Sequence, residues 1–221
     1  MKLKLFSLII IGLLLGSVAA QEEAITPGME KDDSKDLKPG DIAPSWALMF
    51  APGKFEFLRT WAEEEDKKLR LIVSQPDRHA VLMSFFATWC KPCMKELPLL
   101  EEVYQKYKDE RVKFFLVDIT EATRTNPGEV YGVAYKDVPV AGPFLRSKGV
   151  TMQILFDTRG VVMKNYNAQT LPRLFLMDGN RKITLTRRGF HDGEEEKFKK
   201  DLSVEIELLL AELPPAKNET K

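Results

Sequence analysis

Residues 85 to 98 read Phe-Phe-Ala-Thr-Trp-Cys90-Lys-Pro-Cys93-Met-Lys-Glu-Leu-Pro and hold the two cysteines of this 221-residue chain. An apolar, partly aromatic run precedes the cysteines, and a helical pattern follows them. Closing a loop as short as that between Cys90 and Cys93 removes little entropy from the unfolded chain. The pair therefore indicates reversible redox chemistry rather than a structural cross-link, and two inert buried thiols are the alternative.

The composition is that of a globular protein and excludes several classes of function. Apolar residues make up 44% of the chain and charged residues 30%, with 33 basic and 33 acidic side chains. This balance gives no reason to expect a nucleic-acid partner. A zinc site is disfavoured as well, because the chain has no second cysteine pair and only two histidines.

The N-terminus has the pattern of a targeting segment. Lys2 and Lys4 precede an apolar run over residues 5–15, and Val-Ala-Ala at 18–20 offers small residues to a signal peptidase. An uncleaved membrane anchor is the alternative, since the apolar run can be extended to residue 20. In both cases the domain is predicted to be exported, with the periplasm as one such location.

The chain divides into four parts by composition. Residues 1–20 are the predicted signal peptide or anchor, and residues 21–40 are charged and turn-rich, as expected of a flexible tether. Residues 41–213 are predicted to form one domain. Residues 214–221 begin with a pair of prolines and are predicted to be a disordered tail.

The spacing of apolar residues predicts an α/β domain. The continuous apolar run over 80–86 is typical of a buried central strand, and 112–118 has the same character. A helical pattern over 90–108 joins the two, so strand, helix and strand form a βαβ unit. Weaker patterns predict strands over 55–58 and 154–157, a capping-box helix over 60–68, a helical turn over 143–148, a hairpin of 174–177 with 182–186, and a closing helix over 194–213.

Cys90 is expected to be the nucleophile of the pair. It lies where the strand turns into the helix, so free amide groups and the positive end of the helix dipole favour its thiolate. Lys91 adds a nearby positive charge, and Pro92 is tolerated in a first helical turn. Cys93 lies one turn further along, where it can resolve a mixed disulfide.

Glu96 is the next informative residue of this helix. At about 100° per residue from Cys90, the apolar face spans roughly 220° to 340°, and Glu96 lies inside it at about 240°. It is the only carboxylate predicted on that face. A carboxyl group there should have a raised pKa and could exchange a proton with the Cys93 sulfur. Alternatively, Glu96 reaches solvent at the edge of the face, or Pro98 kinks the helix and changes its phase.

The motif Ala-Thr-Trp-Cys-x-Pro-Cys-x-x-Glu-x-Pro resembles the TlpA/ResA branch of the thioredoxin superfamily, exported thiol-disulfide reductases often tied to cytochrome c maturation. The resemblance implies a thioredoxin fold with an N-terminal extension and a central insertion. It also implies that Glu96 lies beside the buried cysteine and that Pro172 is a cis-proline packed against the dithiol. Trp89, Leu171 and Pro172 would then contact the substrate; an ordinary trans proline opening a strand is the alternative for Pro172.

Two departures from the family pattern affect the expected chemistry. Ser84 stands where thioredoxin itself has a buried aspartate, so Glu96 is expected to take over that proton route. The segment over 119–169 matches the pattern poorly, and Leu171 replaces a threonine before the proline. These differences bear on the choice of substrate.

The sequence thus predicts an exported, monomeric thiol-disulfide oxidoreductase that reduces protein disulfides with Cys90, Cys93 and Glu96. It should need no prosthetic group or metal, and a membrane or exported dithiol protein should supply its electrons. The direction rests on the resemblance alone, because a Cys-x-x-Cys motif does not fix a reduction potential, so a disulfide oxidase or isomerase remains an alternative. A second alternative is a copper-binding module that uses both cysteines and His191.

Overall fold

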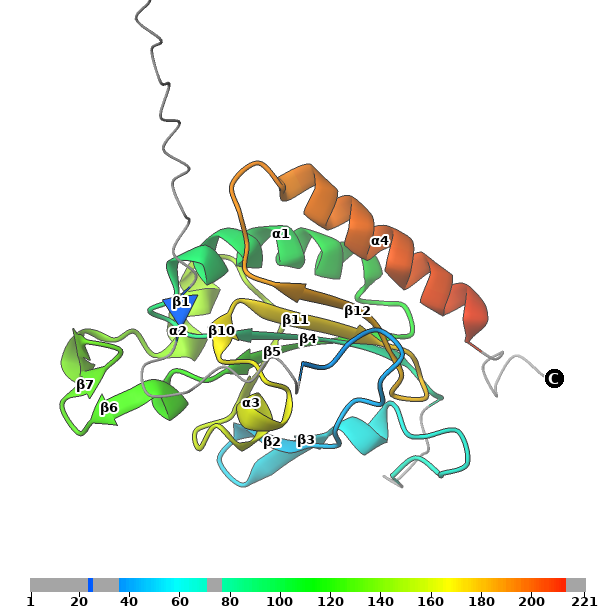
Figure 1. Cartoon of the computed structure of the whole chain (residues 1–221), viewed down its shortest axis with the longest axis horizontal. Coiled ribbons are helices and arrows are strands. Elements are labelled where there is room, and N and C mark those ends of the chain that lie inside the picture. Colours follow the sequence, from blue (N-terminus) through cyan, green and yellow to red (C-terminus); the bar gives the residue numbers. More distant parts are fainter. Residues whose placement is uncertain (1–23, 26–35, 71–76, 214–221) are drawn as a thin grey trace, which may run out of the picture.

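The computed structural model describes residues 24–25, 36–70 and 77–213, and its main feature is a seven-stranded mixed sheet (Figure 1). The strand order is β12-β11-β4-β5-β9-β2-β3. This architecture confirms the predicted α/β class with a central mixed sheet. The strands are β2 (Ala47–Ala51), β3 (Lys54–Phe57), β4 (Ala80–Phe86), β5 (Val112–Asp118), β9 (Gln153–Phe156), β11 (Arg173–Met177) and β12 (Ile183–Arg188).

The predicted βαβ unit forms the centre of the sheet. Strands β4 and β5 are parallel, and α1 (Lys91–Tyr107) connects them. Every residue of β4 is buried, which explains why its sequence is a continuous apolar run rather than an alternating one. The hairpin of β11 and β12 extends the sheet on the other side of β4, where β11 pairs antiparallel.

Helices α1 and α4 (Glu195–Glu212) lie side by side over one face of the sheet (Figure 1). Both bury an apolar stripe at helical spacing, so most of their stability comes from packing on the sheet rather than from intrinsic helix propensity. The buried apolar residues of the two stripes are Leu97, Leu100, Val103 and Tyr107 of α1 and Phe198, Leu202, Ile206 and Leu209 of α4.

The central insertion between β5 and β9 forms structure of its own. Its strands β6 (Arg124–Asn126), β7 (Glu129–Val130) and β8 (Val133–Ala134) make a small antiparallel sheet, which projects from one end of the domain (Figure 1). Helix α2 (Ala141–Ser147) follows where the sequence predicted a helical turn. A short helix, α3 (Val161–Asn165), and strand β10 (Thr170–Leu171) lead from β9 to β11.

The prediction of a helix over 60–68 is wrong. A single 3-10 turn, Leu58–Thr60, precedes this segment, which then continues without a helix. The carboxylate of Glu63, expected to cap its own helix, instead pairs with Arg59 and Arg181, and the Glu63 carbonyl accepts a hydrogen bond from Arg78. Arg78 and Arg181, from distant parts of the chain, therefore hold Glu63 in a conformation that competes with the helix.

Residues on the N-terminal side of the predicted boundary at residue 41 contact the domain. Asp36 forms an ion pair with Arg188 and accepts a hydrogen bond from Asn167, so this part of the predicted tether is attached to the domain. Residues 24–25 form β1, which pairs antiparallel with β10.

The predicted signal segment over 1–20, most of the remaining tether and the tail over 214–221 lie outside the described residues. Among the helices that are described, none is both long and apolar enough to cross a membrane.

Tyr166 fills the core beneath the β4–β11 pair. Its ring centroid lies 5.6 Å from that of Phe85 and 5.1 Å from that of Phe175. Its hydroxyl donates a 2.6 Å hydrogen bond to the carbonyl oxygen of Pro44, which fixes the chain before β2. This bond gives the buried Tyr166 hydroxyl a hydrogen-bond acceptor.

Replacing Tyr166 by phenylalanine tests this link. Tyr166→Phe should lower the free energy of unfolding by about 1–2 kcal/mol, because the Pro44 carbonyl loses its donor while the ring packing is kept. Urea denaturation measures the change. Tyr135→Phe, which removes an exposed hydroxyl, serves as the control and should change stability by less than about 0.5 kcal/mol. Equal effects in the two variants would contradict this role for the Tyr166 hydroxyl.

Candidate active site

Cys90 and Cys93 lie at the N-terminus of α1, directly after the turn that follows β4. Cys90 is the N-cap residue, and the backbone N–H of Cys93 donates a 3.2 Å hydrogen bond to its sulfur. The two cysteines form a disulfide with their Cα atoms 5.3 Å apart. Both are buried. The strand-to-helix position predicted for the pair is therefore confirmed, and it provides a hydrogen-bond donor aimed at the Cys90 sulfur.

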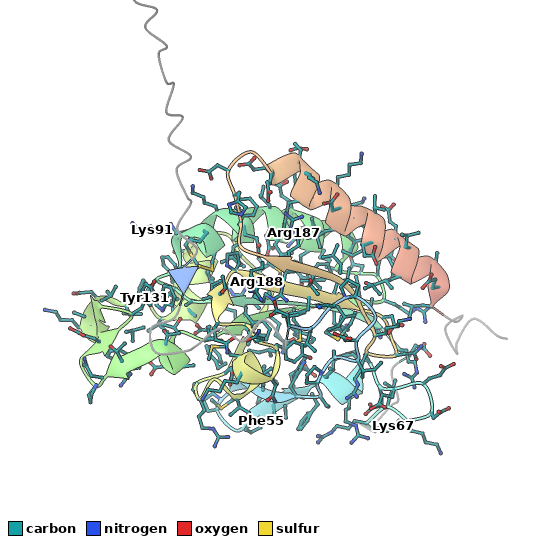
Figure 2. All side chains as sticks on the ribbon, in the orientation of Figure 1. Phe55, Lys67, Lys91, Tyr131, Arg187 and Arg188 are labelled. Atoms are coloured by element: carbon teal, nitrogen blue, oxygen red, sulfur yellow. A yellow bond between two sulfur atoms is a disulfide. The ribbon has the colours of Figure 1, made fainter. Side chains whose placement is uncertain are left out.

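Trp89 connects the dithiol to the central insertion. Its indole N–H donates a 2.8 Å hydrogen bond to the hydroxyl oxygen of Thr123. Its ring stacks on Tyr131, with centroids 4.0 Å apart and an interplanar angle of 6°. Tyr131 lies on the same side of the molecule as Lys91, the first residue of α1 (Figure 2). The insertion is therefore part of the site, which sequence reasoning missed because nothing local in residues 119–140 indicates a partner.

The carboxyl group of Glu96 is buried between α1 and β4. The Ser84 hydroxyl donates a 3.0 Å hydrogen bond to Glu96 Oε1. Burial raises the pKa of Glu96 to about 7, while the Ser84 hydrogen bond and the positive charge of Arg187 act in the opposite direction. The predicted burial and raised pKa are thus confirmed, and Ser84 is the hydrogen-bond partner of Glu96.

A second carboxyl group of this helix is buried outside the predicted apolar face, which leaves Glu96 as the carboxylate on that face. Glu101 is also largely buried, on another side of α1. It accepts hydrogen bonds of 2.8 Å and 3.3 Å from the backbone N–H groups of Thr151 and Met152. Helical phase could not predict this, because the loop before β9 covers a face that would otherwise be exposed.

Pro172 lies at the same end of the sheet as the dithiol. Arg173 pairs with Phe85 in the antiparallel β11–β4 ladder, so Pro172 comes beside the end of β4 from which the chain turns to Cys90. The Leu171–Pro172 peptide bond is cis, as the resemblance implied. Thr170 and Leu171 form β10, one edge of which carries β1. Topology thus brings the dithiol and the Leu171–Pro172 segment together from positions about eighty residues apart.

The two histidines give no metal centre within the described ranges. His79 is half-buried against Trp61, and burial lowers its pKa to about 4. His191 lies in the turn before α4 and is also partly buried. No group of three or more His, Cys, Asp or Glu side chains that could hold a metal ion occurs in residues 36–70 and 77–213.

Known proteins resemble this chain over most of the domain. The family model described as Redoxin matches residues 56–202. The thiol-disulfide oxidoreductase ResA of Bacillus thuringiensis subsp. konkukian is 31% identical over 122 residues, which cover 54% of this chain and 62% of ResA. The sporulation thiol-disulfide oxidoreductase A of Bacillus subtilis is 27% identical over 142 residues, covering 64% and 75% of the two chains.

The solved structures give the fold. The thioredoxin domain of a thiol-disulfide oxidoreductase from Bacteroides vulgatus superimposes with a TM-score of 0.52 at 17% identity, covering 77% of this chain and 99% of that domain. The predicted thioredoxin fold and the resemblance to ResA-like proteins are confirmed by these matches. The alignment with the Bacillus thuringiensis ResA leaves more than a third of that protein uncovered.

Burial of Glu96 should make stability depend on pH. The ordinary pKa of 4.5 in the unfolded chain rises to about 7 on folding, so the folded state binds the extra proton between these values and stability falls as pH rises through them. Glu96→Gln removes this effect. The stability of Glu96→Gln relative to the wild type should therefore increase by about 3 kcal/mol between about pH 4 and about pH 8.

Urea unfolding of the oxidised protein at several pH values measures this difference. Glu102→Gln is the matched control, because Glu102 lies on the exposed side of the same helix. Its stability relative to the wild type should stay constant over the same range. A pH-independent difference for Glu96→Gln would show that the carboxyl group is not held in the buried state described above.

Proposed function

This chain belongs to the Redoxin family, and we propose that it is a thiol-disulfide oxidoreductase that works through Cys90 and Cys93. The observation that carries the proposal is the disulfide at the N-terminus of α1, beside the Leu171–Pro172 segment. The matched relatives from Bacillus support it, since both are thiol-disulfide oxidoreductases by name. The fold supplies a redox pair at one end of the sheet.

In the proposed cycle, two electrons pass from the reduced pair to a protein disulfide. The Cys90 thiolate attacks one substrate sulfur, forms a mixed disulfide and releases the other substrate sulfur as a thiolate. The Cys93 thiol gives its proton to the Glu96 carboxylate, and the Cys93 thiolate attacks the Cys90 sulfur. The Cys90–Cys93 disulfide forms, the second substrate thiolate leaves, and both substrate thiolates take up protons, one of which Glu96 can supply.

The surroundings of the two cysteines suit these different tasks. A thiolate on Cys90 would keep the hydrogen bond from the Cys93 N–H and would lie at the positive end of the α1 dipole. Cys93 is buried on the same face of α1 as Glu96, one turn away. Because the pKa of Glu96 is about 7, its carboxyl group can both accept and release a proton near neutral pH.

The edge of β10 is the proposed docking place for an extended substrate segment. It already accepts an antiparallel strand, because Ala24 pairs with Leu171 and Ile25 with Thr170. A substrate segment would take the place that β1 takes here, with backbone hydrogen bonds giving affinity. Trp89, beside Cys90, would form the neighbouring wall together with Tyr131, with which it stacks.

We further propose that the protein is exported and acts as a reductase, with a membrane or exported dithiol protein as its electron donor. The apolar and small-residue pattern of residues 1–20 supports export. The resemblance to the TlpA/ResA branch supports the reductive direction and a role in cytochrome c maturation. The proposed working form is a monomer without a prosthetic group or metal, in which Cys90 and Cys93 are the redox centre.

The order of attack can be tested by trapping the intermediate. With oxidised insulin as substrate, Cys93→Ser should accumulate a mixed disulfide through Cys90, because the resolving thiol is missing. Mass spectrometry under non-reducing conditions detects the adduct. Cys90→Ser is the matched control and should form at least about tenfold less adduct, since its remaining thiol lacks the helix N-cap position.

Dithiothreitol-driven insulin reduction tests the overall activity. The wild-type chain should catalyse it, and either serine variant should reduce the rate to the uncatalysed level. A predominant adduct through Cys93 would reverse the assigned roles. Absence of the adduct in Cys93→Ser, together with absence of catalysis by the wild-type chain, would contradict the proposed activity.

A further inference from the structure

Arg187 lies on the same face of the sheet as Ser84, the residue that holds Glu96. In the β4–β11–β12 ladder, Leu174 pairs with Ser84 on one side and with Arg187 on the other. Residues paired across neighbouring strands project to the same face, and α1 and α4 cover that face. A positive charge from β12 is thereby placed in the layer that contains the Glu96 carboxyl group.

The guanidinium of Arg187 is fixed from the side of α4. It forms ion pairs with Glu194 at 3.0 Å and with Asp201 at 3.4 Å, and its carbon Cζ lies 5.2 Å from the ring centroid of Phe198. The side chain is only 16% exposed. Its Nε–H is buried and has no hydrogen-bond partner among the described residues. Glu194 and Asp201 therefore satisfy part of the hydrogen-bonding capacity of the buried guanidinium, but not its Nε–H.

We propose that Arg187 is a positioning residue for proton transfer at Glu96: its charge stabilises the ionised carboxylate and sets the pH at which Glu96 can take the proton of Cys93. The inference rests on the proposed function. Arg187 lies more than ninety residues from the dithiol in the sequence.

The charge balance around Glu96 determines how strong this effect can be. From α1, Cys93 faces it; from β4, the Ser84 hydroxyl donates to it; from β12, Arg187 acts on it by charge. On the α4 side, Glu194 and Asp201 are engaged with Arg187 rather than with Glu96. Arg187 is thus the one cation facing this carboxyl group in the described part of the chain. Because Glu194 and Asp201 partly neutralise its charge, Arg187 should have a moderate effect on the ionisation of Glu96.

The geometry also separates Arg187 from its neighbour Arg188. Successive residues of a strand point to opposite faces of the sheet, and Arg188 pairs with Asp36 on the far side from α1. Both arginines are labelled in Figure 2. Removing the charge of Arg188 therefore changes the total charge by the same amount but leaves the Glu96 side of the sheet unaltered.

The test is a pH titration of Glu96 in the full-length oxidised protein. Carbon-13 NMR of labelled glutamate carboxyl groups monitors this titration. Assignment uses Glu96→Gln, which removes the signal. In Arg187→Gln the midpoint should rise by roughly half to one pH unit, because the ionised carboxylate loses a nearby positive charge in a poorly solvated site. Arg187→Met keeps the packing of the aliphatic stem and should give the same shift if Arg187→Gln folds poorly.

Two comparisons make the result specific. Arg187→Lys keeps a positive charge and should restore the midpoint to within about 0.3 pH unit of the wild type, whereas Arg188→Gln should leave it unchanged. The same order should appear in the pH profile of insulin reduction, where Arg187→Gln moves the rising limb to higher pH. An unchanged midpoint in both neutral Arg187 variants, or an equal shift in Arg188→Gln, would overturn the proposal.

The titration separates this proposal from the proposed function. It is measured on the oxidised protein and requires no catalysis. A shifted Glu96 midpoint in a protein that reduces no disulfide would refute the oxidoreductase function while leaving the charge coupling in place. Insulin reduction with a normal pH profile in Arg187→Gln would refute the role of Arg187 and leave the oxidoreductase function intact.

Discussion

The hydrogen bond from Ser84 to the carboxyl group of Glu96 joins the central strand β4 to helix α1 at a point where water is excluded. Burying a carboxyl group with one such partner is unfavourable when the group is ionised. The fold tolerates this because the same face of α1 carries Cys93 and a continuous apolar stripe. The position of Glu96 thus fixes the rotation of α1, which in turn aims the N-terminus of the helix, and with it Cys90, at the end of the sheet.

The remaining parts of the site depend on that arrangement through tertiary contacts. The antiparallel β11–β4 ladder brings Pro172 beside the turn that carries the dithiol, and β10 presents an edge that accepts a strand. Trp89 ties this region to the central insertion by a stacked ring and a hydrogen bond. An extended substrate segment would therefore meet three elements that are held by the core, which limits the reorganisation needed for attack.

Local periodicity predicted the parts of the fold that depend on local interactions. The βαβ unit, the closing hairpin and the phase of α1 with Glu96 on its buried face follow from apolar spacing and were confirmed. The helix expected over 60–68 did not form, because Arg78 and Arg181 hold Glu63 from distant parts of the chain. Tyr131 and Arg187 were missed for a related reason: their partners lie in other elements, and no single-sequence pattern encodes such distant contacts.

The reduction potential of Cys90 and Cys93 shows whether this dithiol can deliver electrons to protein disulfides, as we propose. Equilibration of the full chain in dithiothreitol or glutathione buffers, followed by quantification of the free thiols, gives this potential. We expect a value in the range of the thioredoxins and glutaredoxins, roughly −200 to −270 mV. A value near about −120 mV, typical of a strong disulfide oxidant, would contradict the reductase direction.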